Sequence, residues 1–169
     1  DIGRTHAFRE PLFEFVGRMP LPALNSMFDP LLPPGMQWYW KGHFLNDIPD
    51  AALDVHASFG KRLPTPLSLM HIYPIDGAAA RVANGDTAFA YRDARYSMVI
   101  AGVDPHPAGL PAIRSWAREY WRALAPYSAG GGYVNFMEDE GHDRVRAAYR
   151  DNYARLAKIK AIYDPENLF

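Results

Sequence analysis

The aromatic stretch MQWYWKGHFL, residues 36–45, carries the clearest secondary-structure signal in the chain. Aromatic residues favour β-strands, so this stretch predicts a strand. Successive side chains of a strand point to opposite faces, which gives two sets: Trp38, Trp40 and Gly42, and Tyr39, Lys41 and His43. The chain therefore contains at least one β-strand with different chemistry on its two faces.

Helical patterns follow this strand at three places. The first helix is predicted over residues 49–63, with Asp47 or Asp50 as its N-cap. The second covers residues 112–125, and its apolar residues recur at helical spacing: Ile113, Trp116, Tyr120 and Leu124. A helical tail, with a break near residue 151, occupies the C-terminal part of the chain.

Further strands are predicted between these helices. Residues 66–75 form one, with Leu67, Leu69, His71 and Tyr73 on a shared face. After a turn at residues 84–86, residues 87–91 and 95–103 complete an antiparallel meander, and residues 133–136 form a last short strand. Strands grouped with covering helices predict an α+β fold: an antiparallel sheet covered on one face by helices, with a C-terminal helical tail.

Composition excludes several classes of function. The 169 residues suit one domain or slightly more, and the net charge of −1 gives no basic patch for nucleic acid. The chain has no cysteine, and its six histidines lack metal-ligand spacing, so no metal site is predicted. No apolar run is long enough to cross a membrane. We expect a soluble protein, cytoplasmic or secreted, whose ends at Asp1 and Phe169 are processing or cloning boundaries.

The sequence offers polar side chains on an aromatic sheet rather than a complete catalytic set. We expect six of them to share one sheet face and to line a pocket for a flat or ring-shaped ligand: Tyr39, Lys41, His71, Tyr73, Arg81 and Tyr91. A merely bulky core is the alternative explanation for the aromatic content. The acidic residues Glu138 and Glu140 are interpreted as surface charge.

The C-terminal segment, GYVNFMEDEG…YRDNYARLAKIKAIYDPENLF, resembles the closing motif of the berberine-bridge-enzyme family of FAD-linked oxidases. The matching positions run in the order that the family has: Tyr133, Asn135, Tyr149, Asn152, Arg155, Leu156, Lys160, Asp164, Pro165, Asn167 and Phe169. Upstream, Trp40-Lys41 is similar to a strand of the family's substrate domain. Gly77-Ala78, Arg81-Val82 and TAFAYRDARYSMVI (residues 87–100) also resemble bacterial members.

The resemblance implies a division into residues 1–131, a substrate-binding domain, and residues 132–169, the berberine-bridge-type segment. An N-terminal domain of the same protein would hold most of the FAD, and this chain would cover the flavin ring. By the same mapping Tyr133 and Asn135 should lie beside the flavin. Residues 164–169 should pack on the missing FAD domain.

The implied function is oxidation of an alcohol, a sugar or a secondary metabolite by hydride transfer to FAD. Many members of the family have a tyrosine as catalytic base where this chain has Phe136, which cannot take a proton, so either another group takes it or the reaction class differs. The candidate catalytic residues are Tyr39, Tyr73 and Tyr91, with Lys41 and Arg81 as electrostatic partners; Tyr133 is also available. Two alternatives stay open: a non-catalytic module that binds a small ligand, and a structural domain that forms homodimers.

Overall fold

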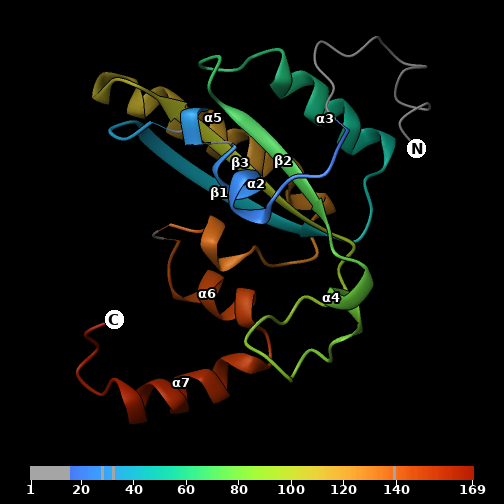
Figure 1. The fold of residues 1–169 in the computed structure, drawn as a ribbon, viewed down its shortest axis with the longest axis vertical. Helices are drawn as coiled ribbons and strands as arrows, with labels where there is room; N and C mark the ends of the chain where they lie inside the picture. The colour runs from blue at the N-terminus through green and yellow to red at the C-terminus, as the bar shows by residue number, and fades with distance from the viewer. Residues whose placement is uncertain (1–15, 28, 32, 139) are drawn as a thin grey trace. The chain divides into compact units, whose positions relative to one another are not determined.

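A computed structural model of the chain describes residues 16–27, 29–31, 33–138 and 140–169 (Figure 1). The chain divides into two compact units, residues 1–34 and residues 35–169. In the first unit the described elements are a short helix α2 (Leu21–Ser26) and a 3-10 turn η1 (Asp29–Leu31). The second unit contains the three-stranded sheet.

The second unit is built on a three-stranded antiparallel sheet. Its strands are β1 (Gln37–Leu45), β2 (Leu69–Pro74) and β3 (Tyr96–Asp104), and β3 lies in the middle. The helices are α3 (Asp50–Gly60), α4 (Gly77–Arg81), α5 (Leu110–Leu124), α6 (His142–Tyr149) and α7 (Asn152–Tyr163). Three 3-10 turns complete it: η2 (Pro107–Gly109), η3 (Ala125–Tyr127) and η4 (Val134–Phe136). The predicted α+β class is confirmed.

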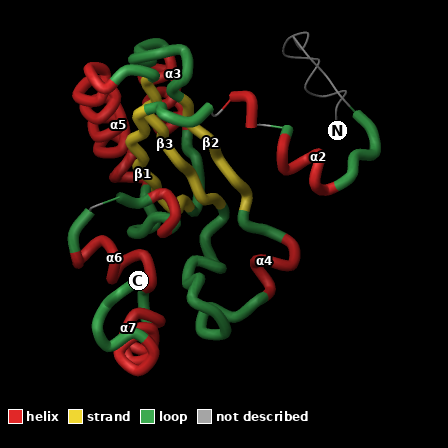
Figure 2. The backbone as a smooth tube through the Cα atoms, turned by 60° about the vertical axis from the view of Figure 1, so that its left-hand side comes forward, coloured by secondary structure: helices red, strands yellow, loops and turns green. Residues whose placement is uncertain are grey.

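Helices α3 and α5 lie together on one face of the sheet, which we call the helix face (Figure 2). The core forms there, and the predicted buried stripe of α5 is confirmed: Ile113, Trp116, Tyr120 and Leu124 are all at most 7 % exposed. From the central strand, Met98 and Ile100 point into the same core. Burying these large apolar side chains supplies most of the stability of the unit.

The opposite face, which we call the aromatic face, carries the other set of strand side chains. The register aligns Gly42 with Val99 and His71 in one row, and Phe44 with Ser97 and Tyr73 in the next. Tyr39 and Lys41 therefore lie on the helix face, whereas His71 and Tyr73 lie on the aromatic face. The expectation that all six polar residues share one face was wrong, because strand alternation separates them.

Some predicted elements differ in the structure. Residues 87–91 form no strand, because side chains rather than another strand form hydrogen bonds with the backbone of this loop. The Asn152 amide donates to the Thr87 carbonyl, and the Asn84 side chain accepts from the Arg92 amide. The meander is thus reduced to β2 and β3. Neither Asp47 nor Asp50 caps α3, whose N-cap position is Pro49.

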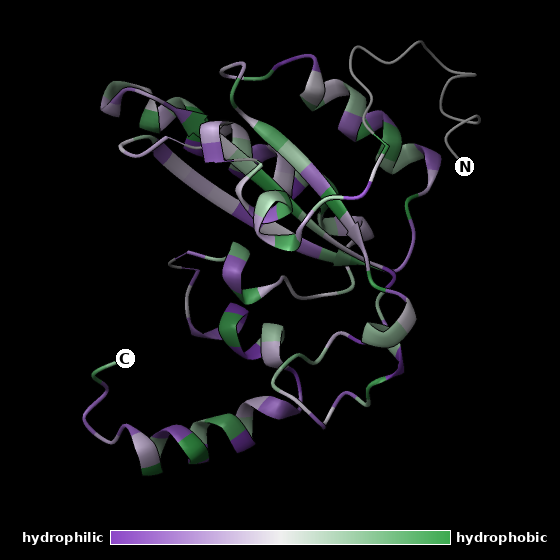
Figure 3. Cartoon of the chain, viewed as in Figure 1, coloured by the Kyte–Doolittle hydropathy of each residue, from purple (hydrophilic) through white to green (hydrophobic). Residues whose placement is uncertain are grey.

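The last predicted strand is also different. Residues 134–136 form the turn η4 instead of a strand, and the Phe136 amide bonds the Tyr133 carbonyl. The predicted break in the tail is confirmed, because α6 ends at Tyr149 and α7 begins at Asn152. Helix α7 mixes hydrophobic and hydrophilic residues along its length (Figure 3). It has no buried residue, and Ile162 and Tyr163 are 72 % and 83 % exposed.

Replacing Gly102 with valine should destabilise the second unit. A Cβ atom on Gly102 would lie 2.7 Å from Cβ of Ile113 and 2.8 Å from its carbonyl oxygen, so α5 would have to move off the sheet. Overpacking of this kind costs about 1–3 kcal/mol or more. Urea denaturation measures the change. Gly60→Ala is the control, since a Cβ there meets no atom within 4 Å; equal stability of the two variants would contradict the packing.

Candidate functional site

The segment that carries the closing motif runs along the free edge of β1. The Phe44 amide donates to the Gly131 carbonyl at 2.8 Å, and the Ala129 amide donates to the Phe44 carbonyl at 2.7 Å. Further along, the Trp40 amide donates to the Glu138 carboxylate at 3.1 Å. An edge strand with unpaired backbone groups invites association with other chains, so this cover protects the sheet. It also fixes η4 next to the sheet.

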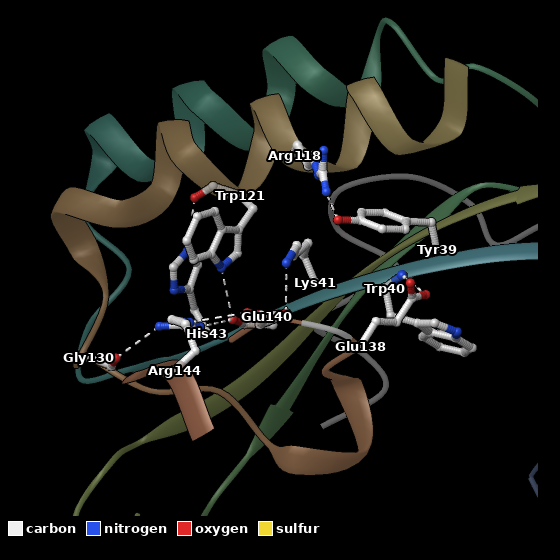
Figure 4. A network of polar contacts seen from close by, with 11 residues as sticks. Tyr39, Trp40, Lys41, His43, Arg118, Trp121, Gly130, Glu138, Glu140 and Arg144 are labelled. Atoms are coloured by element: carbon white, nitrogen blue, oxygen red, sulfur yellow. Dashed lines mark hydrogen bonds and ion pairs between the residues drawn. The ribbon is translucent and has the colours of Figure 1, made fainter. Parts of the chain in front are cut away.

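A buried ion network holds this segment in place (Figure 4). Lys41 Nζ lies 2.9 Å from Glu140 Oε1, and Arg144 Nε lies 3.1 Å from Glu140 Oε2. The side chains of Lys41 and Glu140 are only 9 % and 2 % exposed. The interpretation of Glu140 as surface charge was therefore wrong. Its i, i+4 spacing from Arg144 indicates one of its two partners, whereas the pairing with Lys41 depends on the fold.

The network continues through α5 and β1. The Gly42 carbonyl accepts from Trp121 Nε1 at 3.1 Å and from Arg144 at 3.4 Å. His43 stacks on the Trp121 ring with centroids 5.1 Å apart, and its Nε2 donates to the Trp121 carbonyl at 2.9 Å. Burial lowers the pKa of His43 to about 4, and the Arg144 and Lys41 cations act in the same direction. His43 is therefore neutral at pH 7.

Two of the candidate catalytic residues belong to this structural network. Tyr39 is 4 % exposed, and its hydroxyl accepts a hydrogen bond from Arg118 Nε at 2.8 Å. Lys41 points into the gap between the rings of Tyr39 and Trp121, with Nζ 5.7 and 5.4 Å from their centroids (Figure 4). Both residues lie between the sheet and α5, on the far side of the sheet from the aromatic face.

Tyr91 anchors the C-terminal helices. It is 2 % exposed, and its ring stacks on Phe44 with centroids 4.1 Å apart. Its hydroxyl donates to the Ala147 carbonyl at 2.9 Å, and the Arg150 guanidinium lies 3.5 Å from its ring centroid. The Tyr91 hydroxyl also occupies the space that a Cβ atom on Gly131 would need, at 2.3 Å. These contacts join the loop before β3 to α6 and the β1 edge.

A row of rings crosses the aromatic face. Trp38 and Trp40 are stacked, with centroids 5.0 Å apart, and Phe136 of η4 lies nearly parallel to Trp40 at 6.4 Å. Phe136 also stacks on Tyr73 at 5.9 Å. Gly42 leaves room for Phe136, because a Cβ atom there would lie 3.3 Å from Phe136 Cβ. The row provides an apolar wall of aromatic rings against which a ligand can pack.

Polar groups accompany these rings. Asn135 is exposed and donates to the Tyr133 hydroxyl at 3.1 Å. On β2, His71 Nδ1 lies 2.9 Å from the Tyr73 hydroxyl. The Ser97 hydroxyl, in the same row as Tyr73, is buried and has no hydrogen-bond partner among the described residues. A polar set at the rim of an apolar wall is typical of a small-molecule site.

Tyr133 and Arg81, the other two candidate residues, lie in different surroundings. Tyr133 lines an apolar cavity of about 230 Å³ formed by Phe44, Ala88, Phe89, Gly132, Tyr133, Val134, Ala148 and Tyr149. Arg81 is exposed at the end of α4. The structure thus brings Tyr73, Tyr133 and Asn135 around Phe136.

Among the described residues no group of three or more histidines and acids could hold a metal, and no helix is long and apolar enough to span a bilayer.

Comparisons with known proteins agree with this architecture. Residues 132–169 match the family described as "Berberine and berberine like". An FAD-linked oxidoreductase of Dictyostelium discoideum is 24 % identical over 99 % of this chain and 37 % of its own length. BBE-like 1 of Physcomitrella patens is similar in structure, with a TM-score of 0.68, 21 % identity, and coverage of 79 % of this chain and 29 % of its own.

A further solved structure, glycopeptide hexose oxidase DBV29 complexed with teicoplanin, gives a TM-score of 0.68 at 19 % identity. The alignment covers 79 % of this chain and 31 % of that protein. This chain therefore spans 29–37 % of the length of these three proteins.

Proposed function

We propose that this chain, whose residues 132–169 match the family described as "Berberine and berberine like", is the substrate-facing part of a flavoprotein oxidase. The substrate is an alcohol, a sugar or a secondary metabolite that loses a hydride to FAD. Residues 1–131 bind the substrate, and residues 132–169 form the berberine-bridge-type segment. The observation that carries the proposal is the aromatic face, where Phe136 and its neighbours are fixed beside the sheet by the Lys41–Glu140 ion pair.

The residues on this face fit a flavin ring. Asn135 offers an exposed amide that can donate to ring carbonyls or accept from the ring N–H, and Tyr133 places a phenol next to it. When bound, FAD accepts the hydride, and the residues of this chain orient the reacting carbon and take the proton. The partner of this face is the FAD-binding domain of the same protein.

The exposed apolar residues at the C-terminal end support the same partner. Leu168 and Phe169 are 75 % and 98 % exposed, and Ile162 and Tyr163 of α7 are also largely exposed to solvent. Large apolar side chains that gather at one end of a chain mark an interaction surface. We infer that this end packs on the FAD domain; a homodimer through the same surface is the competing occupant.

The first test is the colour of the purified protein. The polypeptide extended with its N-terminal FAD-binding domain should purify yellow, and an alcohol or a sugar should bleach it without oxygen. Residues 1–169 alone should purify colourless, because few flavin contacts remain. Size-exclusion chromatography of this chain separates the homodimer from the monomer.

A variant makes the test specific for the proposed contact. In the extended protein, Asn135→Leu should alter the visible flavin spectrum, whereas Asn46→Leu, at an exposed amide after β1, should leave it unchanged. Tight FAD binding by residues 1–169 alone would contradict the division of labour. Tight binding of a sugar or an aromatic ligand by an extended protein that stays colourless would instead favour the non-catalytic binding module. The lack of a hydroxyl group on Phe136 is the observation that supports this alternative.

A further inference from the structure

The four tyrosines that could serve in proton transfer differ in what their hydroxyl groups contact. The Tyr39 hydroxyl faces the Arg118 guanidinium, a cation that cannot take a proton. The Tyr91 hydroxyl donates to the Ala147 carbonyl, and the Tyr133 hydroxyl accepts a hydrogen bond from the Asn135 amide. Neither a backbone carbonyl nor an amide N–H is a useful base. Tyr73 alone of the four has a base against its hydroxyl: His71 Nδ1 at 2.9 Å.

Tyr73 and His71 are also held in the right place. They are two residues apart on β2, so both side chains project from the aromatic face. Phe136 packs against the Tyr73 ring at 5.9 Å, and the imidazole meets the same ring edge-on at 5.8 Å. Tyr73 is nevertheless 43 % exposed, so a substrate can reach its hydroxyl. The pair lies directly beside the phenyl ring of Phe136, which itself cannot accept a proton.

We propose that Tyr73 is the catalytic residue that receives the substrate's hydroxyl proton and passes its own proton to His71. This inference rests on the proposed alcohol or sugar oxidation. The substrate C–H bond breaks with its electron pair, which leaves as hydride to the FAD oxidant. The substrate O–H bond breaks toward Tyr73 Oη, and the Tyr73 O–H bond breaks toward His71 Nδ1. A carbonyl product and an imidazolium result, and Tyr73 is neutral before and after.

The relay explains how a tyrosine that is protonated at neutral pH can still take part in proton removal. Burial raises the pKa of Tyr73 above its usual value near 10, so the phenol is protonated at neutral pH and cannot by itself remove a proton. An imidazole nitrogen is a much better proton acceptor than a neutral phenol, so the His71 ring is a suitable resting base. Tyr133, next to η4, is a further titratable group on the aromatic face. Lys41 and Glu140 lie on the opposite face of the sheet. His71 acts through Tyr73 and is a positioning residue that stores the proton.

The test uses the FAD-loaded extended protein and three variants. Tyr73→Phe and His71→Asn should each slow anaerobic bleaching of the flavin by substrate by about 100-fold or more, the usual contribution of a positioned acid or base. Tyr96→Phe is the matched control: it removes a hydroxyl from the neighbouring strand β3 on the helix face. In His71→Asn the rising limb of the pH–rate profile should also move to higher pH, which a purely structural role would not cause.

A second readout does not depend on turnover. With the histidines labelled with ¹⁵N and no substrate present, the NMR chemical shift of His71 Nδ1 should change in Tyr73→Phe, which removes its hydrogen-bond partner, and stay in place in Tyr96→Phe. Bleaching of Tyr73→Phe at the rate of Tyr96→Phe, or an unchanged Nδ1 chemical shift of His71 in Tyr73→Phe, would overturn the relay. A wild-type protein that holds FAD but is bleached by no alcohol or sugar would instead refute the proposed oxidation itself.

Discussion

Replacing Glu140 with glutamine should lower the free energy of unfolding by about 3–5 kcal/mol, the usual cost of breaking a buried ion pair by removing one partner. The change leaves Lys41 as a buried cation without its carboxylate, and Arg144 loses its partner as well. The glutamine side chain has nearly the same shape, so the loss comes from charge rather than from packing. Urea denaturation, followed by circular dichroism, measures it.

Two controls separate this effect from a general loss of charge. Asp47→Asn removes a carboxylate from an ion pair with Arg95, whose side chains are 77 % and 64 % exposed, and should change stability by less than about 1 kcal/mol. The double variant Lys41→Met/Glu140→Gln should recover part of the loss, since it leaves no unpaired lysine at this site. A Glu140→Gln variant as stable as Asp47→Asn would show that the ion pair does not hold the segment.

The second large effect is a loss of stability in mild acid that depends on His43. The folded-state pKa of His43 is about 4, depressed mainly by burial, against about 6.5 in the unfolded chain. Between these values the unfolded state binds the additional proton, so the stabilisation is complete above pH 6.5 and is lost as the pH falls toward 4. The difference amounts to roughly 3 kcal/mol at about 1.4 kcal/mol per pKa unit.

Comparing wild type with His43→Gln isolates this contribution. Glutamine can still donate to the Trp121 carbonyl but does not titrate, so its stability curve should be flatter between pH 6.5 and 4. Other acids and His56, whose pKa is also lowered by burial, titrate in both proteins and cancel in the difference. His106→Gln, at an exposed position, controls for the substitution itself. Parallel curves for wild type and His43→Gln would rule out the assignment.

The sequence was most informative where a local pattern determines the structure. The aromatic run of β1 and the apolar spacing of α5 predicted both elements and the buried side of the helix. Alternation along β2 also placed His71 and Tyr73 on one face, which is the basis of their hydrogen bond. Periodicity is reliable in these cases because one face of each element is buried against the rest of the unit.

Contacts between distant segments could not be predicted in this way. The sequence predicts one face for residues that the structure divides between the two faces of the sheet, because the register between β1 and β2 depends on β3 lying between them. Residues 87–91 have strand-like composition, yet side chains such as Asn152, far along the chain, satisfy their backbone. Glu140 looks like any surface acid until Lys41 is brought beside it.

The closing motif and the border of the sheet are parts of one continuous stretch of chain, in which Gly131 pairs with Phe44 and Glu138 with Trp40. Mutations that reshape the motif for a new substrate therefore also risk uncovering β1. Such changes would be selected for solubility as well as for catalysis.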